Sequence, residues 1–391
     1  MSALLERTQI VAWAETTAND LTFERGRQWV EAGGRAIGML PVWAPHELIW
    51  AAGMLPVGIH GGGDRLDIIR GDAYYQSYIC HLPRSVVELI VGGRLDFLSG
   101  CLFPATCDVI RNLSGMYRIL KPGALVRYVD LPQDFDPASG GKFFATGLRE
   151  LATMLGELRG SPIQDAELFA AISLYNRRRE VVRALYARRR DEPWNVPSDE
   201  LYLLLRAGET VPPGEWIPIA EQYLAICRLD GRKRRDTARV IVVGAFCEQP
   251  PIGLIRTVER SGCSIVDDDF LIGNRFLTAD VPIDGPDPFE ALARTTLAAA
   301  LPSPILYEPD PTAKRLLIVR RLRAARAEGV IFAAPSFCDP ALLDRPMLQA
   351  GADAHGIPYI SFKYAENSGQ FQQFREQAGT FSDALKLWAG A

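Results

Sequence analysis

Two cysteines stand in the same short motif at opposite ends of the chain. Cys107 and Cys338 each complete the pattern Pro-x-x-Cys-Asp, and an apolar run of strand type precedes each copy. A cysteine just beyond the carboxyl end of a strand lies on the edge where open α/β sheets bind ligands. Thiolates are soft ligands that suit zinc and iron–sulfur clusters. The repeat therefore predicts that both cysteines contribute to one shared metal site.

Cys80 is the third candidate ligand. It directly precedes His81, Leu82 and Pro83, and proline suits the first turn of a helix. A cysteine beside a helix amino terminus is favoured as a thiolate by the nearby N–H groups. Three thiolates would leave one iron of a cluster with an open position, as catalytic metal sites do. For each candidate, simple burial as a small hydrophobe is the alternative.

The other four cysteines are more typical of residues packed in the core than of metal ligands. The chain has seven cysteines, an odd number, and none forms a Cys-x-x-Cys pair, which argues against a disulfide framework. We expect Cys101 to pack into the core from its strand, and Cys227 and Cys263 to be core residues as well. Cys247 follows a strand and is the candidate for an additional functional cysteine.

Composition indicates an ordinary globular protein of two or three domains. The chain has 391 residues, of which 48% are hydrophobic and 23% charged, with a net charge of -4. This charge gives no case for nucleic acid or an anionic membrane as partner. The first thirty residues mix charged and apolar side chains and contain no signal-peptide core, so we expect a cytoplasmic protein.

The predicted elements form two similar halves. Strands and helices alternate over residues 33–139, which hold Cys80 and Cys107, and again over 236–391, which hold Cys338. Residues 1–32 form a predicted helical segment, and residues 140–235 form a helical connection. The economical fold is α/β, with two doubly wound, mostly parallel sheets of flavodoxin or Rossmann type related as an internal repeat.

Two further patterns of charged residues each allow more than one interpretation, and the common nucleotide-binding motifs are missing. Arginine runs at 177–179, 188–190 and 232–235 suit either a solvated helix face or the phosphates of a substrate. Asp108 and Asp339 suit a helix cap, a favourable charge near the helix dipole, or catalysis. The sequence has no Walker motif and no Gly-x-Gly-x-x-Gly between a strand and a helix, so energy or electrons would have to come from a partner.

Several segments together resemble the 2-hydroxyacyl-CoA dehydratase and benzoyl-CoA reductase family from about residue 30 onward. They are PHELIWAAGMLPVGI at 45–59, the isolated Cys80, FPATCDVIRNL at 103–113, SGCSIVDDD at 261–269, SFCDP at 336–340 and GIPYISF at 356–362. The closing segment GQFQQFREQAGTFSDALKLW departs from the Gly-Gln-x-x-x-Arg spacing of the dehydratases. It resembles the smaller C (gamma) subunit of ATP-dependent, class I benzoyl-CoA reductases.

The resemblance implies one 4Fe–4S cluster in this chain, held by Cys80, Cys107 and Cys338. It also implies a heterotetramer. A related B subunit would carry a second cluster and the acyl-CoA site. The ATP-hydrolysing A and D subunits, with their own 4Fe–4S cluster, would pass on electrons from ferredoxin.

The implied activity is dearomatising reduction of benzoyl-CoA to cyclohexa-1,5-diene-1-carbonyl-CoA, in anaerobic degradation of aromatic compounds. The cluster of this chain would relay or deliver the low-potential electrons, while no catalytic side chain is identified. Two alternatives stay open. One is the small (beta) subunit of a 2-hydroxyacyl-CoA dehydratase, and the other is a non-enzymatic scaffold that binds metal at the same thiolates.

Overall fold

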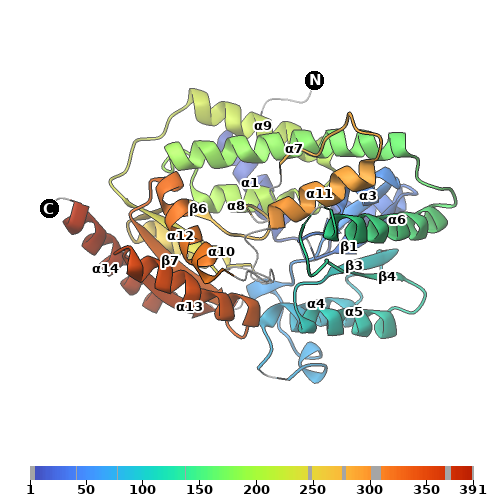
Figure 1. Ribbon diagram of the computed structural model, residues 1–391, viewed down its shortest axis with the longest axis horizontal. Helices are drawn as coiled ribbons and strands as arrows, with labels where there is room; N and C mark the ends of the chain where they lie inside the picture. Colours follow the sequence, from blue (N-terminus) through green and yellow to red (C-terminus); the bar gives the residue numbers. More distant parts are fainter. Residues whose placement is uncertain are drawn as a thin grey trace.

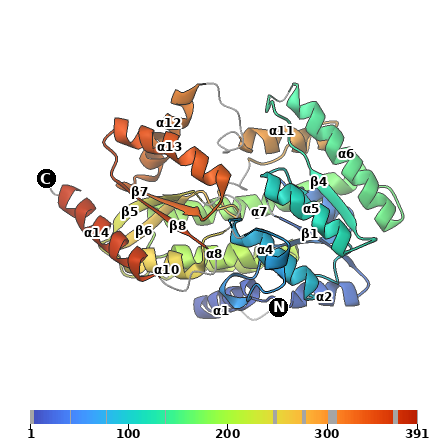
Figure 2. The same ribbon diagram turned by 90° about the horizontal axis from the view of Figure 1, so that it is seen from below.

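The computed structural model describes residues 5–40, 42–76, 78–136, 138–244, 249–274, 279–300, 310–365 and 371–389. Two parallel four-stranded sheets stand side by side with helices around them (Figure 1, Figure 2). The first has the strand order β2-β1-β3-β4, and the second has the order β6-β5-β7-β8. Because both sheets share one order, they are copies of one topology. The predicted α/β class with two related halves is confirmed.

The first sheet consists of β1 (Arg35–Met39), β2 (Met54–Gly58), β3 (Gly100–Pro104) and β4 (Leu125–Val129). Strands β2 and β3 are buried along their whole length, as is typical of parallel sheets with helices on both faces. Helices α4 (His81–Val91) and α5 (Asp108–Leu120) lie on one side and α3 (His46–Ala51) on the other (Figure 1). The short helices η1 (Gly63–Arg65) and η2 (Gly71–Ala73) lie between β2 and α4.

The second sheet consists of β5 (Ala238–Val243), β6 (Cys263–Asp268), β7 (Gly329–Pro335) and β8 (Tyr359–Tyr364). Figure 2 shows α12 (Pro311–Ala325) and α13 (Asp339–Ala354) on one face, and α10 (Ile252–Arg260) and α14 (Gln372–Ala389) on the other. Helix α11 (Pro288–Ala300) packs against α6 (Gly140–Arg159) of the connecting segment. The helices on both faces explain why β7 is an unbroken apolar run.

Helices alone occupy residues 140–235, all of which the structure describes. They are α6 (Gly140–Arg159), α7 (Asp165–Asp191), α8 (Ser198–Ala207) and α9 (Pro213–Leu229), while α1 (Arg7–Ala18) and α2 (Glu24–Glu31) precede the first sheet. The predicted domain boundaries near residues 32, 139 and 235 stay predictions. In the described part of the chain, no helix combines the length and the hydropathy needed to cross a membrane.

Helix α7 extends from one half to the other and forms ion pairs with both (Figure 1). Arg179 pairs with Glu47 of α3, and Arg189 pairs with Asp268 at the end of β6, at 2.6 Å. Arg178 is buried as well and has a carboxylate partner. Both interpretations of the arginine runs are therefore wrong for these three residues. They lie on no solvated face, and their charges are already neutralised by the protein.

Candidate functional site

Cys107 and Cys338 occupy equivalent places in the two halves. Each lies three residues beyond the third strand of its sheet, β3 or β7, and each is the N-cap residue of the next helix, α5 or α13. The chain crosses the first strand of the sheet on its way from the second strand to the third, so the strand order reverses there. Open α/β sheets bind ligands at this reversal.

Cys80 is the N-cap residue of α4, which packs against α5. Its side chain is buried. The matching helix of the second half, just before β7, is α12, and its N-cap residue is Asp310. The first half thus supplies two cysteines at helix amino termini and the second half supplies one.

Tyr75 shares an apolar cluster with two of the three cysteines. Burial raises the pKa of Tyr75, and the thiols of Cys80 and Cys107 raise it further. Cys107 and Cys338 pack against one contiguous apolar cluster, which also contains Tyr75. In the described ranges no three His, Cys, Asp or Glu side chains lie close enough together to hold a metal ion. The role of the three cysteines as ligands stays a prediction.

Three helices therefore begin directly after these cysteines. The N–H groups of a helix's first turn carry partial positive charge, which favours an anion such as a thiolate or an anionic cluster. Asp108 and Asp339 are the first residues of α5 and α13 and neither is the N-cap, so of the two structural roles expected at a helix start the structure confirms the charge near the helix dipole and not the cap. Their carboxylates still lie in the favourable first turn of each helix.

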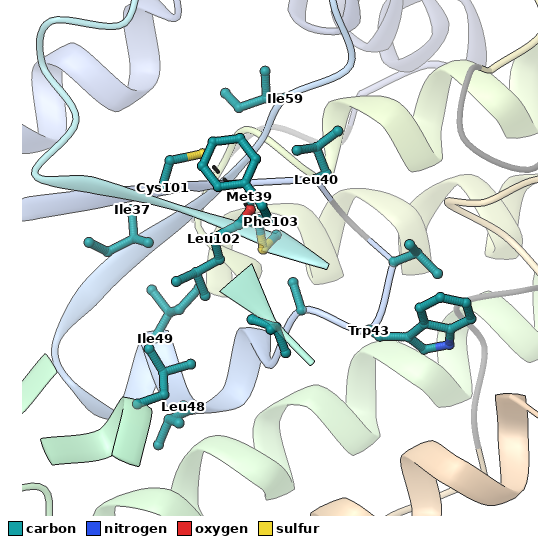
Figure 3. Close-up of a cluster of buried hydrophobic side chains, with 14 of the residues drawn as sticks. Ile37, Met39, Leu40, Trp43, Leu48, Ile49, Ile59, Cys101, Leu102 and Phe103 are labelled. Atoms are coloured by element: carbon teal, nitrogen blue, oxygen red, sulfur yellow. Dashed lines mark hydrogen bonds between the residues drawn. The ribbon is translucent and has the colours of Figure 1, made fainter. Parts of the chain in front are cut away.

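The other described cysteines are structural, as predicted. Cys101 lies on β3 among the buried side chains of Ile37, Leu102 and Phe103 (Figure 3). Burial raises the pKa of Cys101, and it raises the pKa of Cys263 to about 12, so both thiols stay neutral. Cys227 is buried in α9, and burial raises the pKa of its thiol too.

Cys247, the candidate for an additional functional cysteine, lies outside the described residues.

Buried polar atoms without hydrogen-bond partners also gather beyond the strand ends. His60 follows β2, Thr106 follows β3 and precedes Cys107, and Gln249 follows β5. The Nε2 of His60, the hydroxyl of Thr106 and both amide atoms of Gln249 have no hydrogen-bond partner within the described part of the chain. A buried polar group without a partner costs about 1–3 kcal/mol. Such atoms beyond the strand ends are available to a bound group, although buried polar atoms without partners also occur elsewhere in the described residues.

A cavity of about 340 Å³ lies between α12, α13 and the ends of β5 and β6, and Trp43 of the first half and Arg190 of α7 also line it. Its carboxylates are largely neutralised, since Asp267 pairs with Arg321 and Asp344 pairs with Lys314. None of the described residues lining it is a cysteine. The three helix termini with their cysteines are therefore the stronger candidate for redox chemistry.

Sequence-based reasoning missed Tyr75, because it lies in an irregular segment between η2 and α4. Neither periodicity nor a motif distinguishes it from its neighbour Tyr74. Only its closeness to Cys80 in the sequence could have suggested a role.

Comparison with known proteins gives a consistent set of relatives. The family model described as 2-hydroxyglutaryl-CoA dehydratase, D-component, matches residues 41–385. The chain is 49% identical over 387 residues to the C subunit of benzoyl-CoA reductase of Thauera aromatica, covering 98% of this chain and 100% of that one. It is 26% identical over 388 residues to the beta subunit of (R)-2-hydroxyglutaryl-CoA dehydratase of Acidaminococcus fermentans, with 98% and 100% coverage.

A third relative is the beta subunit of (R)-phenyllactyl-CoA dehydratase of Clostridium sporogenes, 24% identical over 355 residues, which cover 91% of this chain and 93% of that one. All three relatives are subunits of enzymes. The predicted resemblance and the prediction of an enzyme subunit are confirmed.

Proposed function

Because the chain belongs to the 2-hydroxyglutaryl-CoA dehydratase D-component family, we propose that it is a subunit of an ATP-dependent benzoyl-CoA reductase. One observation carries the choice within the family. The identity to the C subunit of a reductase is 49% over almost the whole chain, whereas the identity to the two dehydratase beta subunits is 26% and 24%. The dehydratase alternative is therefore the less supported one.

The cofactor of the proposed subunit is one 4Fe–4S cluster, held by Cys80, Cys107 and Cys338. Support comes from three features: the equivalence of Cys107 and Cys338 in the two halves, the helix amino terminus at each cysteine, and the unpartnered polar atoms beyond the strand ends. Cys80, Cys107 and Cys338 would each supply one thiolate to the cluster.

The chain's own residues would shape this site in two ways. The helix termini of α4, α5 and α13 favour the negative charge of thiolates. The apolar cluster buries Cys338, and Cys107 lies half-buried against the same cluster. When bound, the cluster supplies single electrons, at a potential within the roughly -700 to +450 mV range of such clusters. Exclusion of water and few hydrogen bonds to sulfur suit the low end of that range.

The proposed reaction adds two electrons and two protons to the aromatic ring of benzoyl-CoA, which gives cyclohexa-1,5-diene-1-carbonyl-CoA. Ferredoxin is the electron donor, and the A and D subunits couple the transfer to ATP hydrolysis. The B subunit carries the second cluster and binds the acyl-CoA thioester, so this chain relays electrons to it. The thioester carbonyl spreads the added charge and eases the first electron transfer.

The test is an anaerobic assay of the complex of this chain with the A, B and D subunits, supplied with reduced ferredoxin, ATP and benzoyl-CoA. We expect two electrons and ATP to be consumed for every diene formed. Turnover of a 2-hydroxyacyl-CoA with no net use of reductant would contradict the proposal and favour the dehydratase, because that reaction recycles its electron.

A further inference from the structure

Strand β4 is an outer strand of the first sheet, because the strand order β2-β1-β3-β4 ends with it. The Leu125 N–H and the Val129 carbonyl form hydrogen bonds on the side of β3. Backbone groups alternate in direction along a strand, so the N–H and C=O groups of Val126 and Tyr128 point to the opposite side. No other strand of this sheet lies there to pair with them.

Two other edges of the sheets are closed by hydrogen bonds. At β2, the Gly58 N–H donates to the main-chain carbonyl of Glu209, at an N–O distance of 2.7 Å. At β6, the Ser198 hydroxyl donates to the carbonyl of Ile265, at an O–O distance of 3.0 Å. An open edge is a place where another chain can add a strand. The outer edge of β4 borders a groove instead of a closing contact.

This groove has a volume of about 600 Å³ and lies between β4 and α6. Its apolar lining includes Phe144, Leu148 and Met154. Phe143 lines it too and has 54% of its surface exposed, although phenylalanine is among the residues that proteins usually bury. Strand β4 has five residues and is about 17 Å long at the rise of a strand. An extended segment of similar length can pair with it and contact the apolar side chains.

The groove also carries positive charge. Three cations, Arg118, Arg127 and Lys142, line it together with two carboxylates, Asp130 and Glu150. Arg127 pairs with Glu150, at 2.6 Å. Arg118 and Lys142 are exposed, and neither forms an ion pair with another described residue. The groove thus has an excess of positive charge in a chain whose net charge is -4, which favours an acidic partner.

We propose that the outer edge of β4 and its groove bind an extended, acidic segment of a partner subunit, which adds a strand to the first sheet. The backbone of this segment bonds to Val126 and Tyr128, and an apolar side chain contacts Phe143. Its carboxylates pair with Arg118 and Lys142. Strand addition takes its affinity from main-chain hydrogen bonds and its specificity from side-chain contacts. The inference rests on the proposed function only because it requires partner subunits.

The experiment compares hydrogen–deuterium exchange in this chain alone and in its anaerobic complex with the A, B and D subunits. The amides of Val126 and Tyr128 are expected to exchange at least tenfold more slowly in the complex, because the added strand accepts hydrogen bonds from them. The photoreactive residue p-benzoylphenylalanine in place of Phe143 then identifies the bound segment by cross-linking and mass spectrometry. We expect this segment to come from a partner subunit and to contain Asp or Glu.

Val126→Pro tests the role of the backbone, since it removes one outward N–H and leaves the bonds between β4 and β3 intact. Val126→Ala is the matched control, because it loses the same side chain but keeps the N–H. Val126→Pro is expected to weaken assembly at least fivefold, about the factor for one ordinary hydrogen bond, and Val126→Ala is expected to assemble as wild type.

A charge-reversal variant tests the role of the cations. Arg118→Glu/Lys142→Glu is expected to weaken assembly, and the effect should shrink as the salt concentration rises. The control is Arg228→Glu, which reverses an exposed charge in the last turn of α9 and is expected to leave assembly unchanged.

Unchanged exchange of residues 125–130 in an assembled, active complex would overturn the inference and leave the proposed function standing. Protection that appears in the isolated chain as its concentration rises would also overturn it, because the occupant would then be a second copy of this chain. Equal assembly of Val126→Pro and Val126→Ala would contradict the role of the strand edge. Failure of the subunits to assemble at all would refute the proposed function together with the inference.

Discussion

Replacement of Arg189 by leucine should destabilise the protein far more than replacement of an exposed arginine on the same helix. Arg189 and Asp268 have side-chain exposures of 1% and 0%, so the substitution leaves a buried carboxylate without its counter-charge. Breaking a buried ion pair on one side costs about 3–5 kcal/mol. At about 2.1 cal/mol/K of unfolding entropy per residue, this cost lowers the Tm of a 391-residue chain by about 4–6 °C.

Arg177→Leu is the matched control. Arg177 lies on the same helix with 53% of its side chain exposed, and it pairs with Glu180 and Glu221. Such a surface substitution costs about 1 kcal/mol or less, or a Tm change of about 1 °C. Thermal unfolding followed by circular dichroism measures both variants.

A second variant tests the cause. Asp268 also accepts hydrogen bonds from the Tyr186 hydroxyl and the Phe270 N–H, which an asparagine in its place can keep. The double variant Arg189→Leu/Asp268→Asn removes both charges, so it should recover most of the lost stability. Two results would refute the view that this ion pair stabilises the contact between α7 and the second half. One is an equal Tm for Arg189→Leu and Arg177→Leu, and the other is no recovery of Tm in the double variant.

Two further predictions concern pH. Burial first, and then the charge of Arg206, lowers the pKa of His60 to about 3 in the folded protein. The pKa of histidine in the unfolded chain is about 6.5. The folded state is therefore fully stable above pH 6.5 with neutral His60, and it loses stability as the pH falls below that value. Between pH 7 and 5, Tm should fall more steeply in wild type than in His60→Gln, and parallel curves would contradict this. Burial raises the pKa of Glu259 to about 7, so its ionisation in the folded state opposes stability as the pH rises above about 4.5. Glu259→Gln should therefore be about 1–3 kcal/mol more stable than wild type at pH 8, with no gain at pH 5, and an equal effect at both values would contradict this.

The strands and the repeat could be predicted because their signals are local. The buried run of β7 is apolar along its whole length and that of β5 is apolar except for Arg239, and the Pro-x-x-Cys-Asp motif marks the same turn in both halves. Cysteines that directly follow a strand or precede a proline can be placed at the carboxyl edge without knowledge of the packing. The helices α4, α5 and α13 of the candidate site could be predicted from the sequence in this way.

The parts that could not be predicted depend on distant partners. A run of arginines has the same sequence pattern whether it faces solvent or pairs with Glu47 and Asp268, which lie more than 75 positions away. Tyr75 has no periodic or motif signal, because irregular chain holds it against α5.

The proposed function depends on our proposal that Cys80, Cys107 and Cys338 hold one iron–sulfur cluster. The most direct measurement is iron, sulfide and low-temperature EPR of the anaerobic complex, with each of these cysteines changed to serine and with Cys101→Ser as the buried control. We expect each of the three variants to lose one cluster's iron, while Cys101→Ser keeps it. Unchanged iron in the three variants would show that the cysteines are structural and would contradict the account.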